Sequence, residues 1–308
     1  MRDVTTARFT VGLEAHDARV VDVARQHLVV IAIDQVGPYI AAGGVTVNGQ
    51  RATINQRVAA GDVLVATGSR DGALVPEAIE LAVVHEDDDL VVVDKPAGMH
   101  VHPLGAHRRG TLLNALLWHA GARPEQPWAA WRPRPAHRLD RGASGLVVIA
   151  KHRDIHDAMR ALFERHGIDR RYRATVHGLV ATDAGTIDAP LGRDPANDYR
   201  RAVVAGGQAA VTHYRVVRRD AATPGAAPGT TQLELTLATG RTHQIRAPRA
   251  SLGHPIVGDT LYGSPMCATD AAAPAIALRA VSLHLPHPRD HRPITWIAPP
   301  LRADPPLR

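Results

Sequence analysis

Apolar and polar positions alternate over short distances along the first part of the chain, which predicts several small elements. Residues 19–31 and 35–42 have the periodicity of short helices. Residues 43–49 and 58–65 have the alternation of strands and carry turn glycines. Together they predict a compact N-terminal module of about 50 residues, followed by a linker at 67–76, where Gly, Ser and Pro gather.

Longer apolar runs follow in the rest of the chain and predict a larger second domain. A predicted helix at 152–166 places Ile155, Met159, Leu162 and Phe163 on one face. Because strands follow in series with few helices between them, the pattern favours an α+β fold with a mixed, largely antiparallel, extended sheet and a cleft across it. The other predicted elements are strands at 80–84, 90–94, 145–150, 171–177, 209–218 and 231–238, a helix at 111–119 and a surface insertion at 219–230.

Composition narrows the class of protein. Of the 308 residues, 45% are hydrophobic and 21% are charged, so the chain can bury a core and is not a disordered protein. The formal net charge of +6 favours an anionic partner such as nucleic acid. A coding bias toward Ala and Arg explains the same excess equally well, since only Lys95 and Lys151 are lysines.

Compartment and metal binding are constrained by a few residue types. The single cysteine, Cys267, cannot form an internal disulfide, which favours a reducing cytosol. The N-terminal residues lack the apolar segment of a signal peptide, and the apolar run at 28–33 is far shorter than a membrane helix, which needs about 20 residues. We therefore expect a soluble, cytoplasmic protein without a membrane partner.

His100, His102 and His107 lie in a Gly/Pro loop without an HExxH pattern, which favours polar loop histidines over a metal site.

The segment 137–151, HRLDRGASGLVVIAK, is the strongest candidate for chemistry. Asp140 stands between Arg138 and Arg141, just before a glycine turn and an apolar strand. A loop that presents a carboxylate at a strand edge suits a catalytic acid, base or nucleophile, and nearby arginines would keep it ionised. A surface ion pair is the alternative. The order of residues differs from the kinase HRD loop, the GxSxG elbow of hydrolases and the phosphate-binding P-loop.

A second candidate segment is rich in cations. Arg241, His243, Gln244 and Arg246 gather at the start of a predicted helix that follows a strand, which is a favourable place for an anion. Helix capping with solvated charge is the alternative. The acidic and the basic segments lie about 100 residues apart and could meet in one cleft.

These segments resemble the RluA-type pseudouridine synthases of RNA. The resemblance includes VTVNG and AAGDVL within 14–66, which are similar to the small alpha-L RNA-binding module that often precedes the catalytic domain of this family. It implies three parts: a module at 14–66, a linker at 67–79 and a pseudouridine synthase domain at 80–301. The catalytic blocks are DLVVVDKPAGMHVHP (89–103), HRLD with SGL and AK (137–151), RYRATVHG (171–178), GRTHQIR with LGHPIVGD and YG (240–263) and, more weakly, 278–300.

The resemblance also implies an activity that needs no cofactor. Such an isomerase detaches uracil from C1′ of a uridine in RNA, rotates it and rejoins it through carbon 5. Asp140 aligns with the catalytic aspartate, whose role as nucleophile or base stays open, and Arg246 with the arginine that pairs with it. Tyr172 aligns with the tyrosine that packs on the target base, which must be flipped out of the RNA. The other substrate-binding residues implied are Arg138, which helps fill the gap left in the RNA, His137 and Arg241.

Several positions depart from the family pattern. Gly142-Ala143 stands where Asp-Thr is usual, and Ala247-Pro248 where Val-His is usual, so Pro248 is expected to remove a helical N–H and bend the helix after Arg246. Leu278-Arg279-Ala280 replaces a Leu-His-Ala pattern, and 28–42 carries no Lys or Arg. The expected target is ribosomal large-subunit RNA, with tRNA next. The alternatives are a non-catalytic RNA-binding factor and an enzyme such as a glycosidase that pairs Asp140 with Asp259.

Overall fold

The computed structural model describes residues 7–67, 73–105, 107–124, 126–222, 229–263 and 275–300. Cys267 and residues 223–228, half of the predicted insertion at 219–230, lie outside these ranges. The chain forms two compact units that interleave in sequence. The first comprises 1–81, 100–135 and 149–156, and the second comprises 82–99, 136–148 and 157–308. The proposed boundary at 67–79 stays a prediction.

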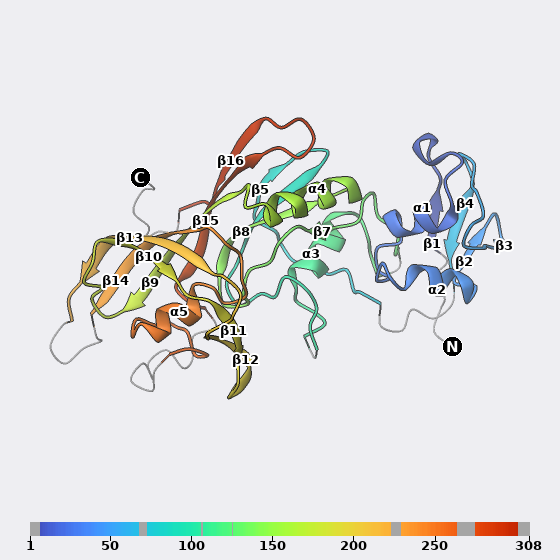
Figure 1. Ribbon diagram of the computed structural model, residues 1–308. Coiled ribbons are helices and arrows are strands. Elements are labelled where there is room, and N and C mark those ends of the chain that lie inside the picture. The colour runs from blue at the N-terminus through green and yellow to red at the C-terminus, as the bar shows by residue number, and fades with distance from the viewer. Residues whose placement is uncertain are drawn as a thin grey trace. The chain divides into compact units, whose positions relative to one another are not determined.

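The first unit contains a small four-stranded sheet in the order β1-β4-β2-β3, with two short helices (Figure 1). Asn48 and Gly49 both have positive φ, 50° and 83°, which is the backbone of a tight turn between β2 and β3. Its elements are β1 (Ala7–Thr10), a 3₁₀ turn (Leu13–Ala15), α1 (Val20–His27), α2 (Val36–Ala41), β2 (Val45–Val47), β3 (Gln50–Arg51), β4 (Val63–Ala66), α3 (Leu112–His119) and β7 (Arg134–Pro135).

A buried arginine joins the two sequence-distant parts of this unit. Arg132 is 6% exposed, and its guanidinium donates to the carbonyl oxygens of Leu28 at 2.6 Å and Ile31 at 3.0 Å. The N-terminal helices therefore share one core with the 117–129 segment, to which Leu117 and Trp128 contribute. No helix in the described ranges is both long and apolar enough to cross a membrane.

The second unit is built on a large sheet in the order β10-β13-β14-β9-β15-β8-β6-β5, with β16 paired to β15. All strand pairs with a known register are antiparallel except β15 with β8, which confirms the mixed, largely antiparallel α+β fold. Its elements are β5 (Val83–Glu86), β6 (Leu90–Lys95), most of β8 (Ser144–Ala150) and α4 (Arg153–Glu164), β9 (Asp169–His177), β10 (Ala184–Asp188), β11 (Leu191–Asp194), β12 (Asn197–Val203), β13 (Val211–Asp220), β14 (Thr230–Leu237), α5 (Arg246–Ser251), β15 (Leu278–Pro286) and β16 (Pro293–Ile297).

The burial of these strands follows their sequence patterns. In β6 and β8 nearly every residue is buried, as expected for continuous apolar runs in the middle of a sheet. In β9 and β14 buried residues alternate with partly exposed ones, so one face carries the core. Gly145 has φ of 111°, and a Cβ there would lie 2.1 Å from the Ala280 oxygen, so only glycine lets β8 pass this close to β15.

Candidate active site

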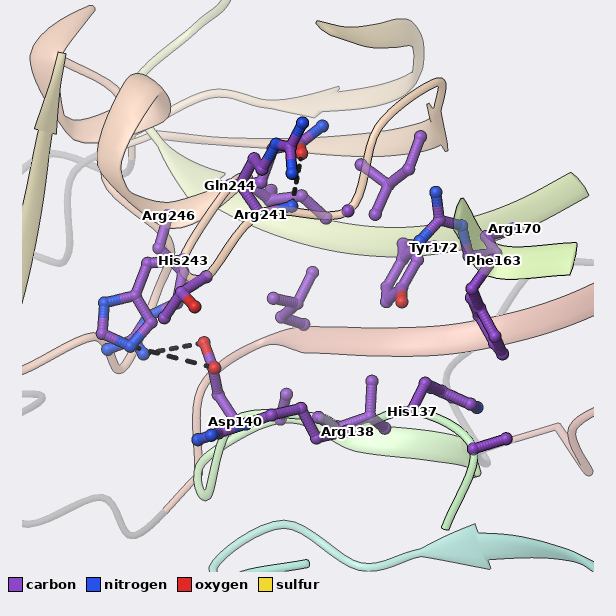
Figure 2. Close-up of a pocket in the computed structure, with 18 of the residues that line it drawn as sticks. His137, Arg138, Asp140, Phe163, Arg170, Tyr172, Arg241, His243, Gln244 and Arg246 are labelled. Carbon is purple, nitrogen blue, oxygen red and sulfur yellow. Dashed lines mark hydrogen bonds and ion pairs between the residues drawn. The ribbon is translucent and has the colours of Figure 1, made fainter. Parts of the chain in front are cut away.

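A pocket of about 460 Å³ lies in the second unit, and residues of the inner strands β9, β14 and β15 of the large sheet contribute to its lining. The other lining residues come from the loop 136–143 that leads into β8, from 163–166 at the end of α4, and from the turn 240–245 with the start of α5. Figure 2 shows the Asp140 carboxylate directed at His243 and Arg246, with Tyr172 on the other side of the pocket. The acidic and basic segments predicted from sequence therefore meet.

Arg246 connects two carboxylates. Its Nη1 donates to Asp140 Oδ2 at 2.9 Å, while Nε and Nη2 donate to the two oxygens of Asp259 at 2.7 and 2.8 Å. Burial opposes the charge of Arg246, but the hydrogen bonds to Asp259 and the charge of Asp140 outweigh it and raise the pKa of this guanidinium above its usual range. Arg246 is therefore a permanent cation that orients Asp140.

The two carboxylates differ in access to solvent. The Asp259 side chain is fully buried, at 0% exposed, and it also accepts from the backbone N–H groups of Leu261 and Tyr262. The Asp140 side chain keeps 18% of its surface exposed and faces the pocket. Both oxygens of Asp259 already accept hydrogen bonds and have no access to solvent, so Asp259 cannot act on a substrate as a catalytic acid. Asp140, by contrast, can be reached by a substrate.

Asp140 is paired with Arg246 and not with its sequence neighbours Arg138 and Arg141. Arg141 donates its Nε–H to the carbonyl oxygen of Gly98 at 3.2 Å, and Arg138 is exposed. Among the described residues, neither forms an ion pair with Asp140. The expectation that the flanking arginines hold this carboxylate is corrected, because the loop turns both away and α5 supplies Arg246 instead.

His243 approaches the second oxygen of Asp140, with Nε2 at 3.8 Å from Oδ1. Its Nδ1 lies 2.8 Å from the Tyr262 hydroxyl, and that hydroxyl accepts the Arg201 backbone N–H at 2.6 Å. The two ring nitrogens of His243 thus face Tyr262 on one side and Asp140 on the other. Burial lowers the pKa of His243, which keeps the ring neutral at pH 7.

Lys95 holds the turn that follows Asp140. This fully buried ammonium donates to the carbonyl oxygens of Ala143 at 2.6 Å, Pro96 at 2.8 Å and Met99 at 2.9 Å. Burial lowers the pKa of Lys95 to about 8, and the charges of Asp140 and Asp94 act in the opposite direction. Gly142-Ala143 therefore contributes backbone oxygens rather than side chains, and the departure from Asp-Thr leaves these contacts available.

The side of the pocket away from Arg246 is mainly aromatic. Tyr172 is 8% exposed, and burial raises the pKa of its phenol. The His137 ring packs on Phe163 with centroids 4.9 Å apart, and its Nε2 accepts the Val148 N–H at 3.1 Å. Arg170 lies over the Phe163 ring and donates to the Thr239 oxygen at 2.8 Å. His137 thus fixes the loop to β8 while lining the pocket.

The environment of His137 predicts a pH dependence of stability. Burial and the charge of Arg170 lower the pKa of His137 to about 3, so the unfolded chain takes up this proton first as the pH falls below about 6.5. Because the unfolded state then binds more protons, we expect the free energy of unfolding to fall with decreasing pH, by up to about 1.4 kcal/mol per pH unit from this group. Urea unfolding between pH 7 and 4.5 measures this slope. His137→Gln, whose amide oxygen can accept the Val148 N–H, should have a shallower slope, and an unchanged slope would contradict this assignment.

The remaining predicted residues lie at the rim or in the helix. Arg138 and Arg241 line the pocket and are both exposed. Pro248 is the third residue of α5, and its neighbours Ala247 and Arg249 donate their N–H groups to the carbonyl oxygens of His243 at 3.0 Å and Ile245 at 3.3 Å. Pro248 has no N–H to continue this series, so the expected loss of a helical hydrogen bond is confirmed. Within the described ranges, no group of three or more His, Cys, Asp or Glu side chains is placed to hold a metal ion.

Three residues of this arrangement were not predicted as parts of the site. The signals for Lys95 were its rarity and its place in the 89–103 block, and Asp259 was considered only as an alternative catalytic acid. Tyr262 had no signal beyond its place in the YG pair of the 240–263 block. Each acts through a contact with a distant part of the chain.

Comparison with known proteins gives a consistent result. Residues 89–251 match the family described as RNA pseudouridylate synthase. The ribosomal large subunit pseudouridine synthase D of Pseudomonas aeruginosa is 36% identical over 313 residues, which cover 97% of this chain and 93% of that protein. The protein of the same name from Nitrosomonas europaea is 40% identical over 263 residues, 83% of this chain and 73% of that one.

The fold agrees with solved structures as well. Human RNA Pseudouridylate Synthase Domain Containing 1 aligns with a TM-score of 0.59 at 20% identity, over 74% of this chain and 92% of that one, which shows a shared fold. Asp140, Tyr172 and Arg246 all lie within the range that matches the family. From the extent of these similarities, this chain belongs to the RNA pseudouridylate synthase family and is an isomerase that forms pseudouridine in RNA.

Proposed function

We propose that this protein converts specific uridines of ribosomal large-subunit RNA to pseudouridine, with Asp140 as the catalytic carboxylate. The observation that carries the proposal is the ion pair between Asp140 and Arg246 in the lining of a pocket large enough for a small ligand. The names of the relatives from Pseudomonas aeruginosa and Nitrosomonas europaea support the choice of RNA.

The reaction replaces the bond from C1′ to N1 of uracil by a bond from C1′ to carbon 5. One carboxylate is sufficient for this exchange, as a nucleophile or as a base, provided that it stays charged and oriented. Arg246 supplies both conditions through its bond to Asp140 Oδ2, and Nε2 of His243 faces the other oxygen. Because the pocket admits a base only outside the helical stack, the target uridine has to flip out of the RNA, at a cost of a few kcal/mol.

Tyr172 is proposed to pack its ring on the flipped base. The ring lines the pocket opposite Asp140 (Figure 2) and its hydroxyl has no part in the proposed chemistry. We therefore expect Tyr172→Phe to retain activity within about threefold, whereas Tyr172→Ala should lose about 10-fold or more in kcat/KM, because stacking of a base on an aromatic ring contributes about 1–3 kcal/mol. Tritium release from RNA labelled at carbon 5 of uridine measures both. Equal loss in the two variants would instead assign the hydroxyl a role.

The decisive test of the function is a map of pseudouridines in total RNA from cells with and without the gene. We expect one or a few sites in large-subunit ribosomal RNA to disappear with the gene and to return with the wild-type protein. Sites lost only from tRNA would change the substrate but not the activity. Rescue of the sites or of growth by Asp140→Ala would contradict the catalytic role of Asp140 and favour a non-catalytic RNA-binding function.

A further inference from the structure

A second depression adjoins the active-site pocket and carries only positive charge. Its volume is about 410 Å³, and Arg193, Arg201 and Arg241 line it, with no Asp or Glu among its lining residues. Arg241 and Thr242 line both this depression and the pocket of Asp140. A nucleotide in the pocket would therefore place the adjacent part of its chain beside these three arginines.

Arg193 and Arg201 of the β11–β12 ribbon lie close enough to repel each other when no anion is bound between them. Arg193 and Arg201 are direct cross-strand partners, so their side chains leave the same face of the ribbon. Like charges directly opposite each other destabilise a strand pair. Among the described residues neither forms an ion pair, whereas Arg200, next in the chain to Arg201, is paired with Asp194 at 3.5 Å. An anion between Arg193 and Arg201 would remove this repulsion.

Two glycines, Gly206 and Gly207, form part of the lining of the depression. A Cβ at Gly207 would lie 2.7 Å from the backbone carbon of Leu191, so glycine lets this turn pack directly against β11. At Gly206, with φ of 77°, a Cβ would meet nothing within 4 Å, so the space beside this residue is open. Gln208 and Thr242 add neutral hydrogen-bonding groups to the lining.

The ribbon is also fixed relative to the catalytic carboxylate. The Arg201 N–H donates to the Tyr262 hydroxyl, which bonds His243, which in turn faces Asp140. The ribbon packs against α5, the helix that carries Arg246 (Figure 1). An anion held at Arg193 and Arg201 would thus have a defined position with respect to the reacting nucleotide.

From this geometry we propose that the depression binds a backbone phosphate of the substrate RNA next to the target uridine, through Arg193, Arg201 and Arg241. The inference rests on the proposed function for the identity of the RNA, but not for the chemistry of the ligand, which is a phosphodiester. Guanidinium groups suit this ligand because they donate paired hydrogen bonds to phosphate oxygens. This contact would offset part of the cost of flipping the base.

The test compares two double variants that remove the same charge. Arg193→Gln with Arg201→Gln alters the depression, and Arg218→Gln with Arg292→Gln removes two exposed arginines that line neither pocket. The substrate is an unmodified transcript of large-subunit ribosomal RNA labelled with tritium at carbon 5 of uridine. We expect the first pair to raise KM about tenfold or more relative to the second, with a smaller effect on kcat. We also expect it to reduce the slope of log KM against log salt by about 0.7 for the lost phosphate contact.

Equal KM values and salt slopes in the two double variants would overturn the phosphate site. If the wild-type protein releases no tritium from this transcript, the proposed function fails, and the site is then judged by the RNA affinities of the same variants in fluorescence anisotropy. Measurements in inorganic phosphate and in chloride, at equal ionic strength, distinguish a backbone phosphate of RNA from free inorganic phosphate as the ligand of the depression. A specific effect of inorganic phosphate that the first pair abolishes, without any change in RNA affinity, would assign the depression to the free ion and also overturn the proposal.

Discussion

Asp140→Asn is expected to lower the rate of pseudouridine formation by about 10³-fold or more while the protein folds normally. Asparagine has the same shape, and its amide oxygen can accept the Arg246 Nη1–H that Asp140 Oδ2 accepts. Arg246 keeps its two bonds to Asp259, so no buried charge loses its partner. The variant therefore removes the charge of the proposed nucleophile or base while keeping its shape and its bond to Arg246.

Tritium release at saturating RNA gives the rate, and far-ultraviolet circular dichroism with RNA binding checks the fold. The matched control is Asp188→Asn, an exposed aspartate of β10 that lines neither pocket and should retain full activity. Loss of the folded state in Asp140→Asn would assign Asp140 a structural role instead. Retained activity would exclude it from the chemistry.

Arg246→Met is expected to destabilise the protein and to inactivate it, for two separable reasons. The substitution leaves Asp259, whose side chain is 0% exposed, as a buried carboxylate without its cation. Breaking a buried pair in this way costs about 3–5 kcal/mol in the free energy of unfolding, which urea denaturation measures. Arg218→Met removes an exposed arginine paired with Asp220 and should cost less than about 1 kcal/mol.

A second substitution separates the structural from the catalytic part of this effect. Asp259→Asn in the Arg246→Met background removes the stranded charge, and its amide oxygen still accepts the N–H groups of Leu261 and Tyr262. We expect most of the lost stability to return and the activity to remain absent, since Asp140 still lacks its cation. Recovery of activity together with stability would show that Arg246 acts only through the fold.

Several strands with a continuous or an alternating apolar pattern were predicted from the sequence, whereas two mostly exposed strands were missed. The runs at 90–94 and 145–150 became β6 and β8, whose residues are almost all buried. By contrast, β10 and β12 were missed, because their residues are mostly exposed or half-buried and carry no apolar alternation. Their strand conformation comes from pairing with β13 and β11, which the local sequence does not encode.

Some residues of the candidate active site were likewise predictable from the sequence, and others were not. Sequence motifs identified the segments of Asp140 and Arg246, but their residues alone left open whether two groups separated by 106 positions meet, and it was the family resemblance that implied the pair. The contacts that set the geometry around this pair depend on tertiary structure. Asp259 reaches Arg246 only because the chain folds back after α5, and Tyr262 reaches His243 for the same reason. No local pattern predicts such contacts.

The buried ammonium of Lys95 occupies a place that an arginine cannot take. Nearly all basic residues of this chain are arginines, with Lys95 and Lys151 the two lysines. The enclosure of Lys95 consists of carbonyl oxygens around a single nitrogen, a shape that fits a compact tetrahedral donor and not a flat guanidinium. Arginine is therefore not a conservative exchange at position 95, because its flat guanidinium would push the loop of Asp140 out of place.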